Sequence, residues 1–181
     1  MTAMMPVKTI SSSVPAKLAD WPVTPCQRGQ AWEWDGVRFQ MLHPAADSGA
    51  RRNDASCVLK VSAGKHAVLL TGDIEKAAEW RLLQQDASLL SADVLVAPHH
   101  GSNTSSTASF IRAVGPGYVL FPVGYRNRYG FPRPPVVQRY QQTGARMLDT
   151  ASAGAISFDL GRETLQPAGY RDTARRYWHD R

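Results

Sequence analysis

Alternation of apolar and polar positions predicts two antiparallel hairpins in the first half of the chain. In residues 31–41, apolar side chains alternate with polar ones on both sides of the turn dipeptide Asp35-Gly36. A second pair of apolar runs, at 57–61 and 67–70, is separated by a short turn that contains glycine. Each pair of runs is therefore expected to form two neighbouring strands of a sheet.

From residue 74 onward, helical segments alternate with short apolar strands. Parallel strands need a crossover connection, which is usually a helix, so this alternation predicts a parallel sheet. We therefore expect a mixed α/β protein, with antiparallel hairpins first and parallel crossovers second. The expected helices are 74–90, 109–114 and 136–143, and the expected strands are 92–97, 118–123, 146–148 and 155–160.

The length of 181 residues corresponds to one ordinary domain. Residues 1–30 are rich in Ser, Pro, Thr and Ala without sustained periodicity, which predicts a loosely ordered lead-in. The domain itself is expected at 31–161, followed by a basic C-terminal tail at 162–181. No apolar run approaches the roughly 18 residues that cross a bilayer, and residues 1–8 lack a secretory pattern, so the chain alone is expected to be soluble.

A basic charge balance changes the range of expected partners. There are 21 Lys and Arg against 15 Asp and Glu, which gives a formal charge of +6 and favours anionic ligands. The alternative is a solvated basic face with a basic tail and no ligand. The chain has two cysteines, Cys26 and Cys57, which exclude a zinc finger and a disulfide framework but leave a single bridge open.

Candidate metal ligands follow two of the expected parallel strands. Asp73 comes directly after Thr71-Gly72, although it is equally placed to cap a helix that begins at residue 74. His99 and His100 end the next strand, within Pro-His-His-Gly-Ser. Because a parallel crossover brings both strand ends to one edge of the sheet, we expect Asp73 and a histidine to lie close enough to share a metal ion.

A third loop, residues 124–134, alternates guanidinium, amide and aromatic side chains. Arginine pairs with phosphate oxygens and tyrosine stacks on bases, so this loop is typical of a site for an anionic, stackable ligand. The alternative is a rigid, proline-rich surface loop. A phosphate-binding loop, a nucleophile elbow and a cysteine nucleophile beside histidine are all absent from the sequence, which disfavours nucleotide hydrolysis and serine-type acyl transfer.

Three motifs, taken together, resemble the metallo-β-lactamase-like domain of ComEC-type competence proteins. They are Leu-Leu-Thr-Gly-Asp at 69–73, Ala-Asp-Val-Leu-Val-Ala-Pro-His-His-Gly-Ser at 92–102 and Gly-Tyr-Arg-Asn-Arg-Tyr-Gly-Phe-Pro at 124–132. The resemblance implies an αββα sandwich with a two-metal hydrolytic site. It also implies an inner-membrane protein that passes single-stranded DNA into the cell, whose soluble, outward-facing domain is a proposed nuclease.

The resemblance also implies roles for individual residues. Asp73 would bridge two divalent metals, Mn or Zn, and His99 or His100 would be a ligand of one of them; these three residues are the expected catalytic and metal-binding set. Asn53 and Ser56 are further candidate ligands. The expected substrate-binding residues, which would contact DNA phosphate or base, are Ser102, Tyr125, Arg126, Asn127, Arg128 and Arg133.

The sequence departs from the family pattern at two places, and these differences change the activity that we expect of the chain. The signature His-x-(His/Asp)-x-Asp-His is absent from the 181 residues, and Phe-Pro-Arg-Pro at 131–134 replaces a common His-Pro-His-Pro. We therefore expect only the C-terminal portion of the sandwich and a chain that is a poor nuclease by itself, next to the upstream membrane part of such a protein. The alternatives are a non-catalytic DNA-binding or structural remnant, and a site completed by another chain.

Overall fold

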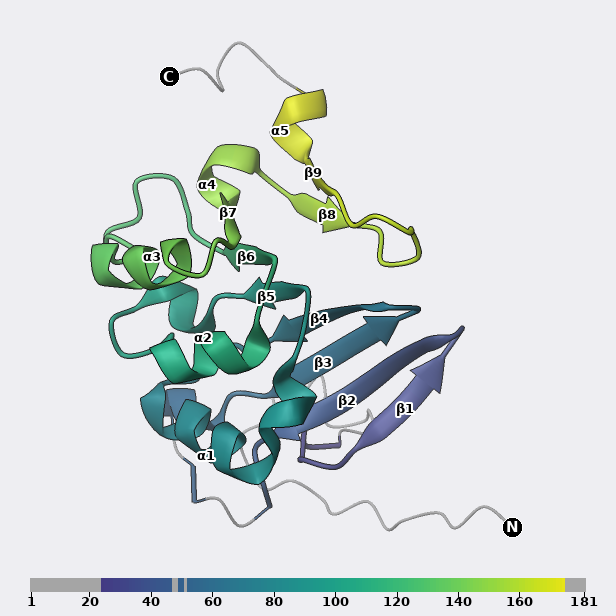
Figure 1. Ribbon diagram of the computed structural model, residues 1–181. Helices are drawn as coiled ribbons and strands as arrows, with labels where there is room; N and C mark the ends of the chain where they lie inside the picture. Colours follow the sequence, from purple (N-terminus) through teal and green to yellow (C-terminus); the bar gives the residue numbers. More distant parts are fainter. Residues whose placement is uncertain (1–23, 47–48, 51, 175–181) are drawn as a thin grey trace, which may run out of the picture.

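The computed structural model describes residues 24–46, 49–50 and 52–174, which form an α/β protein around a mixed sheet (Figure 1). The sheet has seven strands in sequential order, antiparallel from β1 to β4 and parallel from β4 to β7. Its strands are β1 (Ala31–Trp34), β2 (Val37–His43), β3 (Val58–Ala63), β4 (His66–Leu70), β5 (Val94–Val96), β6 (Tyr118–Phe121) and β7 (Arg146–Asp149).

Three helices connect the parallel strands, and smaller elements complete the described chain. The connecting helices are α1 (Lys76–Asp86), α2 (Ala108–Val114) and α3 (Pro134–Gln141). The three-residue strands β8 (Ile156–Phe158) and β9 (Pro167–Gly169) pair in a separate small sheet, next to the short helices α4 (Thr150–Ala153) and α5 (Tyr170–Thr173). Short 3-10 turns are η2 (Arg52–Ala55), η3 (Ala87–Leu90) and η4 (Pro98–Gly101).

The core lies between one face of the sheet and the connecting helices. Leu69, Leu95 and Val119 occupy equivalent positions of β4, β5 and β6, and all three are fully buried. They belong to one apolar cluster with Phe110 of α2 and Tyr140 of α3. Because this cluster includes residues of all three connecting helices, these helices pack against the same face of the sheet. The parallel pairing of β4 to β7 places the carboxyl ends of these strands at one edge.

The second face of the sheet is covered around β6 by the small β8–β9 sheet. Tyr118 of β6 packs edge-to-face on Phe158, with ring centroids 5.3 Å apart, and its hydroxyl donates to the Leu165 carbonyl at 3.1 Å. Leu165 is itself buried. These contacts explain why ordered structure continues into the segment that was expected to be a C-terminal tail.

The two hairpins and the three parallel crossovers predicted from the sequence are confirmed, although the first and last residues of the elements differ from those predicted. The first crossover helix begins at Lys76 rather than residue 74, and its last turn, from Ala87, is a 3-10 turn. The bridge that the sequence left open is present between Cys26 and Cys57. Most of the predicted lead-in, residues 1–23, and the terminal Arg175, Arg176 and Arg181 lie outside the described residues. Within the described part of the chain, no helix is both long and apolar enough to cross a membrane.

Candidate functional site

Asp73 lies where β4 ends, beside the end of β5. The buried Thr71 hydroxyl donates to the Val96 carbonyl at 2.7 Å, which joins the two strand ends. The backbone at Gly72 has φ of +54°, and an added Cβ there would lie 2.9 Å from the Cβ of Ser56. The Asp73 amide donates to the Ser56 hydroxyl at 3.2 Å. Close packing of this turn against Ser56 therefore fixes the backbone from which the Asp73 carboxylate extends.

Asp73 does not cap the following helix, so that alternative is wrong. Helix α1 begins at Lys76, and its N-cap residue is Glu75, whose side chain makes no capping hydrogen bond. The Asp54 carboxylate supplies the missing acceptor, because its Oδ1 accepts from the amides of Glu75 at 2.9 Å and Ala78 at 3.2 Å. The Asp73 carboxylate is consequently available to the neighbouring histidine.

The two histidines leave β5 in a backbone conformation that few residues adopt. His99 and His100 have φ of +46° and +55°, and Gly101 follows at +84°. Consecutive left-handed residues are costly and persist only where their surroundings hold them. The His99 amide donates to the Gly72 carbonyl at 3.0 Å, which ties this turn to the Asp73 turn.

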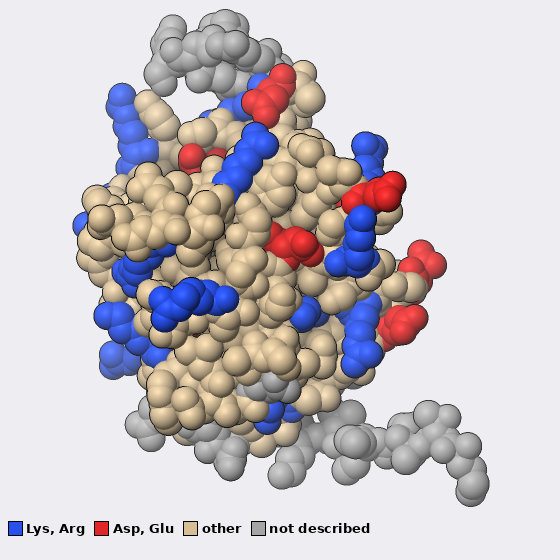
Figure 2. All heavy atoms as spheres, viewed as in Figure 1, with Lys and Arg blue, Asp and Glu red and all other residues tan. Residues whose placement is uncertain are grey.

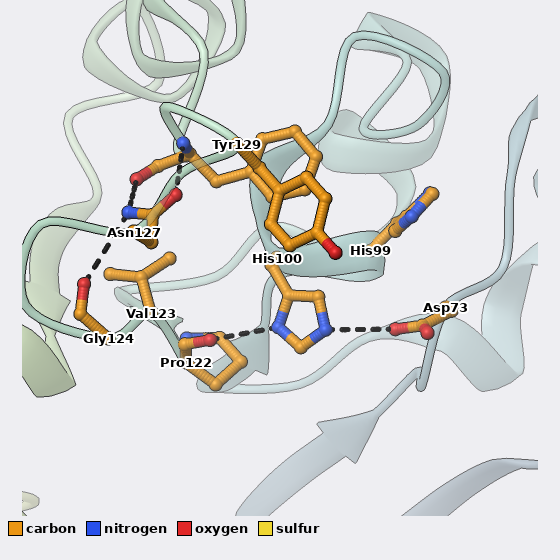
Figure 3. Close-up of a pocket in the computed structure, with 9 residues that line it drawn as sticks. Asp73, His99, His100, Pro122, Val123, Gly124, Asn127 and Tyr129 are labelled. Carbon is orange, nitrogen blue, oxygen red and sulfur yellow. Dashed lines mark hydrogen bonds and ion pairs between the residues drawn. The ribbon is translucent and has the colours of Figure 1, made fainter.

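His100 is the histidine that meets Asp73 (Figure 3). Its Nδ1 lies 2.8 Å from the Pro122 carbonyl oxygen, and since a carbonyl only accepts, Nδ1 must carry a hydrogen. Its Nε2 lies 3.3 Å from Asp73 Oδ1. This geometry fits an imidazolium–carboxylate ion pair, and it equally fits a neutral imidazole whose Nε2 lone pair shares a cation with the carboxylate.

His99 belongs to a different network from His100. Its Nδ1 lies 3.2 Å from both Glu75 Oε1 and the Thr104 hydroxyl, and Thr104 also donates to Glu75 at 3.0 Å. Asn53 donates to the same Glu75 oxygen at 3.2 Å. The predicted ligand set is therefore divided, and the described residues contain no group of three or more metal-type ligands.

A cavity of about 450 Å³ opens beside the Asp73–His100 pair. Asp73, His99 and His100 line one side. The opposite side comes from the loop after β6, through Asn127, Tyr129 and Phe131, together with backbone around Pro122. Figure 3 shows Tyr129 reaching from that loop across the cavity, with its hydroxyl end directed toward the histidines.

The loop between β6 and α3 is held by its own asparagine. Asn127 Nδ2 donates to the Phe131 carbonyl at 2.8 Å, and the Phe131 amide donates back to Asn127 Oδ1 at 2.9 Å. Both ends of the amide are thus used within the loop. Asn127 therefore braces the loop and also lines the cavity, where the substrate contact predicted for it stays a prediction.

Three arginines of this loop lie over aromatic rings. The guanidinium carbons of Arg126, Arg128 and Arg133 lie 5.1, 4.9 and 5.6 Å from the ring centroids of Tyr125, Tyr129 and Phe131, respectively. The predicted substrate residues Tyr125, Arg126, Arg128 and Arg133 are therefore gathered on one exposed loop. Ser102 is not with them, because it is buried and its hydroxyl bonds Thr104.

Comparison with known proteins finds relatives that are named as competence and recombination proteins. The chain is 43% identical over 133 residues to "Competence protein ComA" of Neisseria gonorrhoeae, a match that covers 74% of the chain and 19% of that protein. It is 33% identical over 141 residues to "Recombination protein 2" of Haemophilus influenzae, covering 78% and 18%. The chain is homologous to part of these proteins.

A further homologue carries no functional name. "Uncharacterized protein YcaI" of Escherichia coli is 36% identical over 155 residues, which cover 86% of the chain and 21% of that protein. The chain thus spans about a fifth of the length of the curated relatives it matches. No family model matches the sequence.

Behind the histidine turn, Glu79 of α1 is a buried carboxylate that the sequence analysis missed. It accepts from the amides of Ser106 at 2.5 Å and Thr107 at 2.8 Å, while Arg139 of α3 donates to the Ser106 carbonyl at 2.6 Å. Burial raises the pKa of Glu79, against the lowering effects of its Thr107 and Ser106 hydrogen bonds and of Arg139. This network joins α1 and α3 to the segment that follows the histidines and leads into α2. A glutamate within a helical run gives no sequence signal of this role.

Positive charge lines the edge of the molecule that carries the loop between β6 and α3. Figure 2 shows blue side chains along the edge of the molecule that carries α3 and the loop before it, whereas blue and red side chains are interspersed on the opposite edge. Such a surface attracts polyanions and repels other cations. It complements the negative carboxylate of Asp73 inside the cavity.

Gly101 offers a direct test of how tightly the histidine turn is packed. A Cβ at this position would lie 2.7 Å from Pro132 Cβ and 3.0 Å from the Phe121 ring, at a φ of +84°. We expect Gly101→Ala to lower the free energy of unfolding by about 2 kcal/mol, as measured by urea denaturation. Gly144→Ala is the matched control, since its φ is also positive, at +75°, and no atom lies within 4 Å of its added Cβ. Equal stabilities of the two variants would contradict the packing argument.

Proposed function

We propose that this chain provides part of a metallo-β-lactamase-like, metal-dependent nuclease domain in a DNA-uptake protein. The observation that carries the proposal is the Asp73–His100 pair at the ends of two adjacent parallel strands. The Nδ1–H of His100 donates to the Pro122 carbonyl, and its Nε2 faces the Asp73 carboxylate. Relatives named as competence and recombination proteins support the setting. Under this proposal, the remaining ligands come from another segment of a longer protein or from another chain.

The geometry of the pair fits two ligands of one cation. Ligand bonds of about 2.0 to 2.2 Å at a tetrahedral angle separate a nitrogen and an oxygen by about 3.4 Å. The observed Nε2–Oδ1 distance is 3.3 Å. A metal-binding histidine also commonly donates its other ring N–H to a backbone carbonyl, as His100 does to Pro122. His100 rather than His99 is therefore the proposed ligand, with Asp73 as the carboxylate.

The face of β1–β3 that lies opposite the described helices supports a sandwich architecture. Lys60 of β3 extends to the helix side, where it donates to the Leu89 carbonyl, so the neighbouring Val61 points to the other face. Val61 is paired with Phe39, which stacks on Trp32 with ring centroids 5.1 Å apart. An aromatic face of this kind, with helices covering only the opposite side, is what one half of a two-sheet sandwich presents to the other.

Each group of the site has a distinct proposed task. Asp73 and His100 would hold a divalent metal, which would supply an activated water and neutralise charge on a phosphodiester. The Pro122 carbonyl holds the tautomer of His100, and the Ser56 and Gly72 turn holds Asp73. Arg126 and Arg128 belong to the loop that lines the cavity, and their positive charge would receive the phosphates flanking the scissile one.

Metal titration of the purified chain tests the proposal. We expect weak Zn²⁺ or Mn²⁺ binding by calorimetry and near-background nuclease activity, because the described residues offer only two ligands at one point. Asp73→Ala and His100→Ala should each weaken that binding about tenfold or more, while His99→Ala leaves it nearly unchanged. Binding that is the same in Asp73→Ala as in the unmodified chain would refute the assigned ligands.

A second candidate function is DNA binding without catalysis. The exposed arginine–aromatic loop favours it, since its three cation–π pairs do not depend on Asp73 or His100. One binding experiment distinguishes the metal-dependent nuclease from the non-catalytic DNA-binding function. Salt-dependent binding of DNA that survives both chelator and Asp73→Ala, with no rescue of cleavage by added metal, supports the non-catalytic function.

A further inference from the structure

Tyr129 is placed differently from the other tyrosine of its loop. It lines the cavity beside Asp73 and His100, whereas Tyr125 does not. Its ring stacks on Phe131 with centroids 5.7 Å apart and planes inclined by 20°. More than half of Tyr129, 54%, is nevertheless exposed. An aromatic surface therefore stands open to solvent next to the candidate metal ligands.

The orientation of this ring is set by contacts with Arg128 and Phe131, which leave more than half of the residue exposed. Arg128 Nη2 donates to the Tyr129 hydroxyl at 2.7 Å, and its guanidinium lies 4.9 Å from the ring centroid. Phe131, the stacking partner, is fixed through the Asn127 hydrogen bonds and packs edge-to-face on His99, with centroids 5.9 Å apart. A ring that is already oriented loses little conformational entropy when a planar ligand stacks on it.

The cavity is too small for a double helix and suits a single nucleotide. Its volume of about 450 Å³ falls in the lower part of the range that holds one small ligand. A base inside a duplex is covered on both faces by its neighbours, so it has no face to offer Tyr129 unless it leaves the stack. A phosphate alone would make no use of the aromatic surface.

We infer that Tyr129 is the base-stacking residue of the site, that Arg128 positions it, and that the cavity receives one unpaired nucleotide. This inference rests on the proposed function, because the phosphate of that nucleotide would lie toward Asp73 and His100. Tyr129 then sets the requirement for an unpaired base at the reacting position. Arg126 and Arg133 contribute positive charge that attracts any DNA phosphate, whatever the base sequence or strand.

Abasic oligonucleotides test the inference without requiring cleavage. A fluorescent single-stranded oligonucleotide is compared with a set in which one nucleotide at a time is replaced by an abasic residue, using anisotropy at low salt. One abasic position should weaken binding to the unmodified chain by about fivefold or more, since stacking is worth about 1 to 3 kcal/mol per base in affinity. Tyr129→Leu should remove that penalty, and Tyr129→Phe should retain it.

Tyr125→Leu is the matched control, because Tyr125 is also exposed and also lies under an arginine but is outside the cavity. Its abasic penalty should equal that of the unmodified chain, even if its overall affinity is lower. Absence of any DNA binding would reject the proposed function itself. Binding without a position-specific penalty, or a penalty that persists in Tyr129→Leu, would reject the role of Tyr129 and leave the proposed function standing.

Discussion

Reducing the bridge between Cys26 and Cys57 should lower the free energy of unfolding by about 3 to 4 kcal/mol. The two cysteines are 31 residues apart, and closing a loop of that length removes this much conformational entropy from the unfolded chain. The bridge joins the segment that enters β1 to the start of β3. Urea unfolding with and without reductant measures the effect as a shift of the midpoint at constant slope.

The double variant Cys26→Ser/Cys57→Ser is the control for this prediction. It should be as unstable as the reduced chain and should not respond to reductant. Ser56, next to the bridge, accepts from the Asp73 amide, so hydrogen exchange in residues 53–57 and 71–75 should also rise on reduction. Identical unfolding midpoints in oxidised and reduced protein would contradict the prediction.

Replacing Glu79 with alanine should cost about 3 kcal/mol of stability. The substitution removes the acceptor for two backbone N–H groups, those of Ser106 and Thr107, and a buried donor without a partner costs about 1 to 3 kcal/mol. It also leaves Arg139 without the nearby carboxylate. Glu79→Gln keeps a side-chain oxygen as an acceptor and should lose less. Thermal and urea unfolding of both variants at one pH provide the measurement.

The same carboxyl should make stability depend on pH. Because burial raises the pKa of Glu79 above its ordinary value of 4.5, the folded state binds this proton more tightly than the unfolded state. Its contribution to stability is therefore complete below pH 4.5 and is lost as pH rises through the raised pKa. Relative to Glu79→Gln, which does not titrate, the unmodified chain should lose stability over that interval. An unchanged difference between the two proteins would show that the pKa is not raised.

Local pattern was sufficient to predict the main elements of the fold. The alternating runs around Asp35-Gly36 form β1 and β2, and the strand–helix alternation forms three parallel crossovers. These signals are short-range, because side-chain period depends only on the local backbone geometry. The same reasoning placed Asp73 and the histidine pair at one sheet edge, as the structure has them. It failed for β9, a three-residue strand whose pairing with β8 is stabilised by contacts to Tyr118.

The roles within the site depended on contacts that no local pattern specifies. Sequence alone could not separate His99 from His100, because their directions follow from two left-handed residues that are held by the Gly72 carbonyl and by Pro122. It assigned substrate contact to Asn127 and Ser102, whose polar groups are used by Phe131 and Thr104.

The sequence by itself determined that Asp73, the histidines and an arginine–tyrosine loop follow parallel strands of one sheet. Only the tertiary structure decided that His100 meets Asp73, that His99 joins Glu75, and that Tyr129 rather than Tyr125 lines the cavity. The physical reason is the range of the forces involved. Strand ends are ordered by local periodicity and crossover geometry, whereas the direction of a side chain is set by hydrogen bonds and packing from segments distant in the chain.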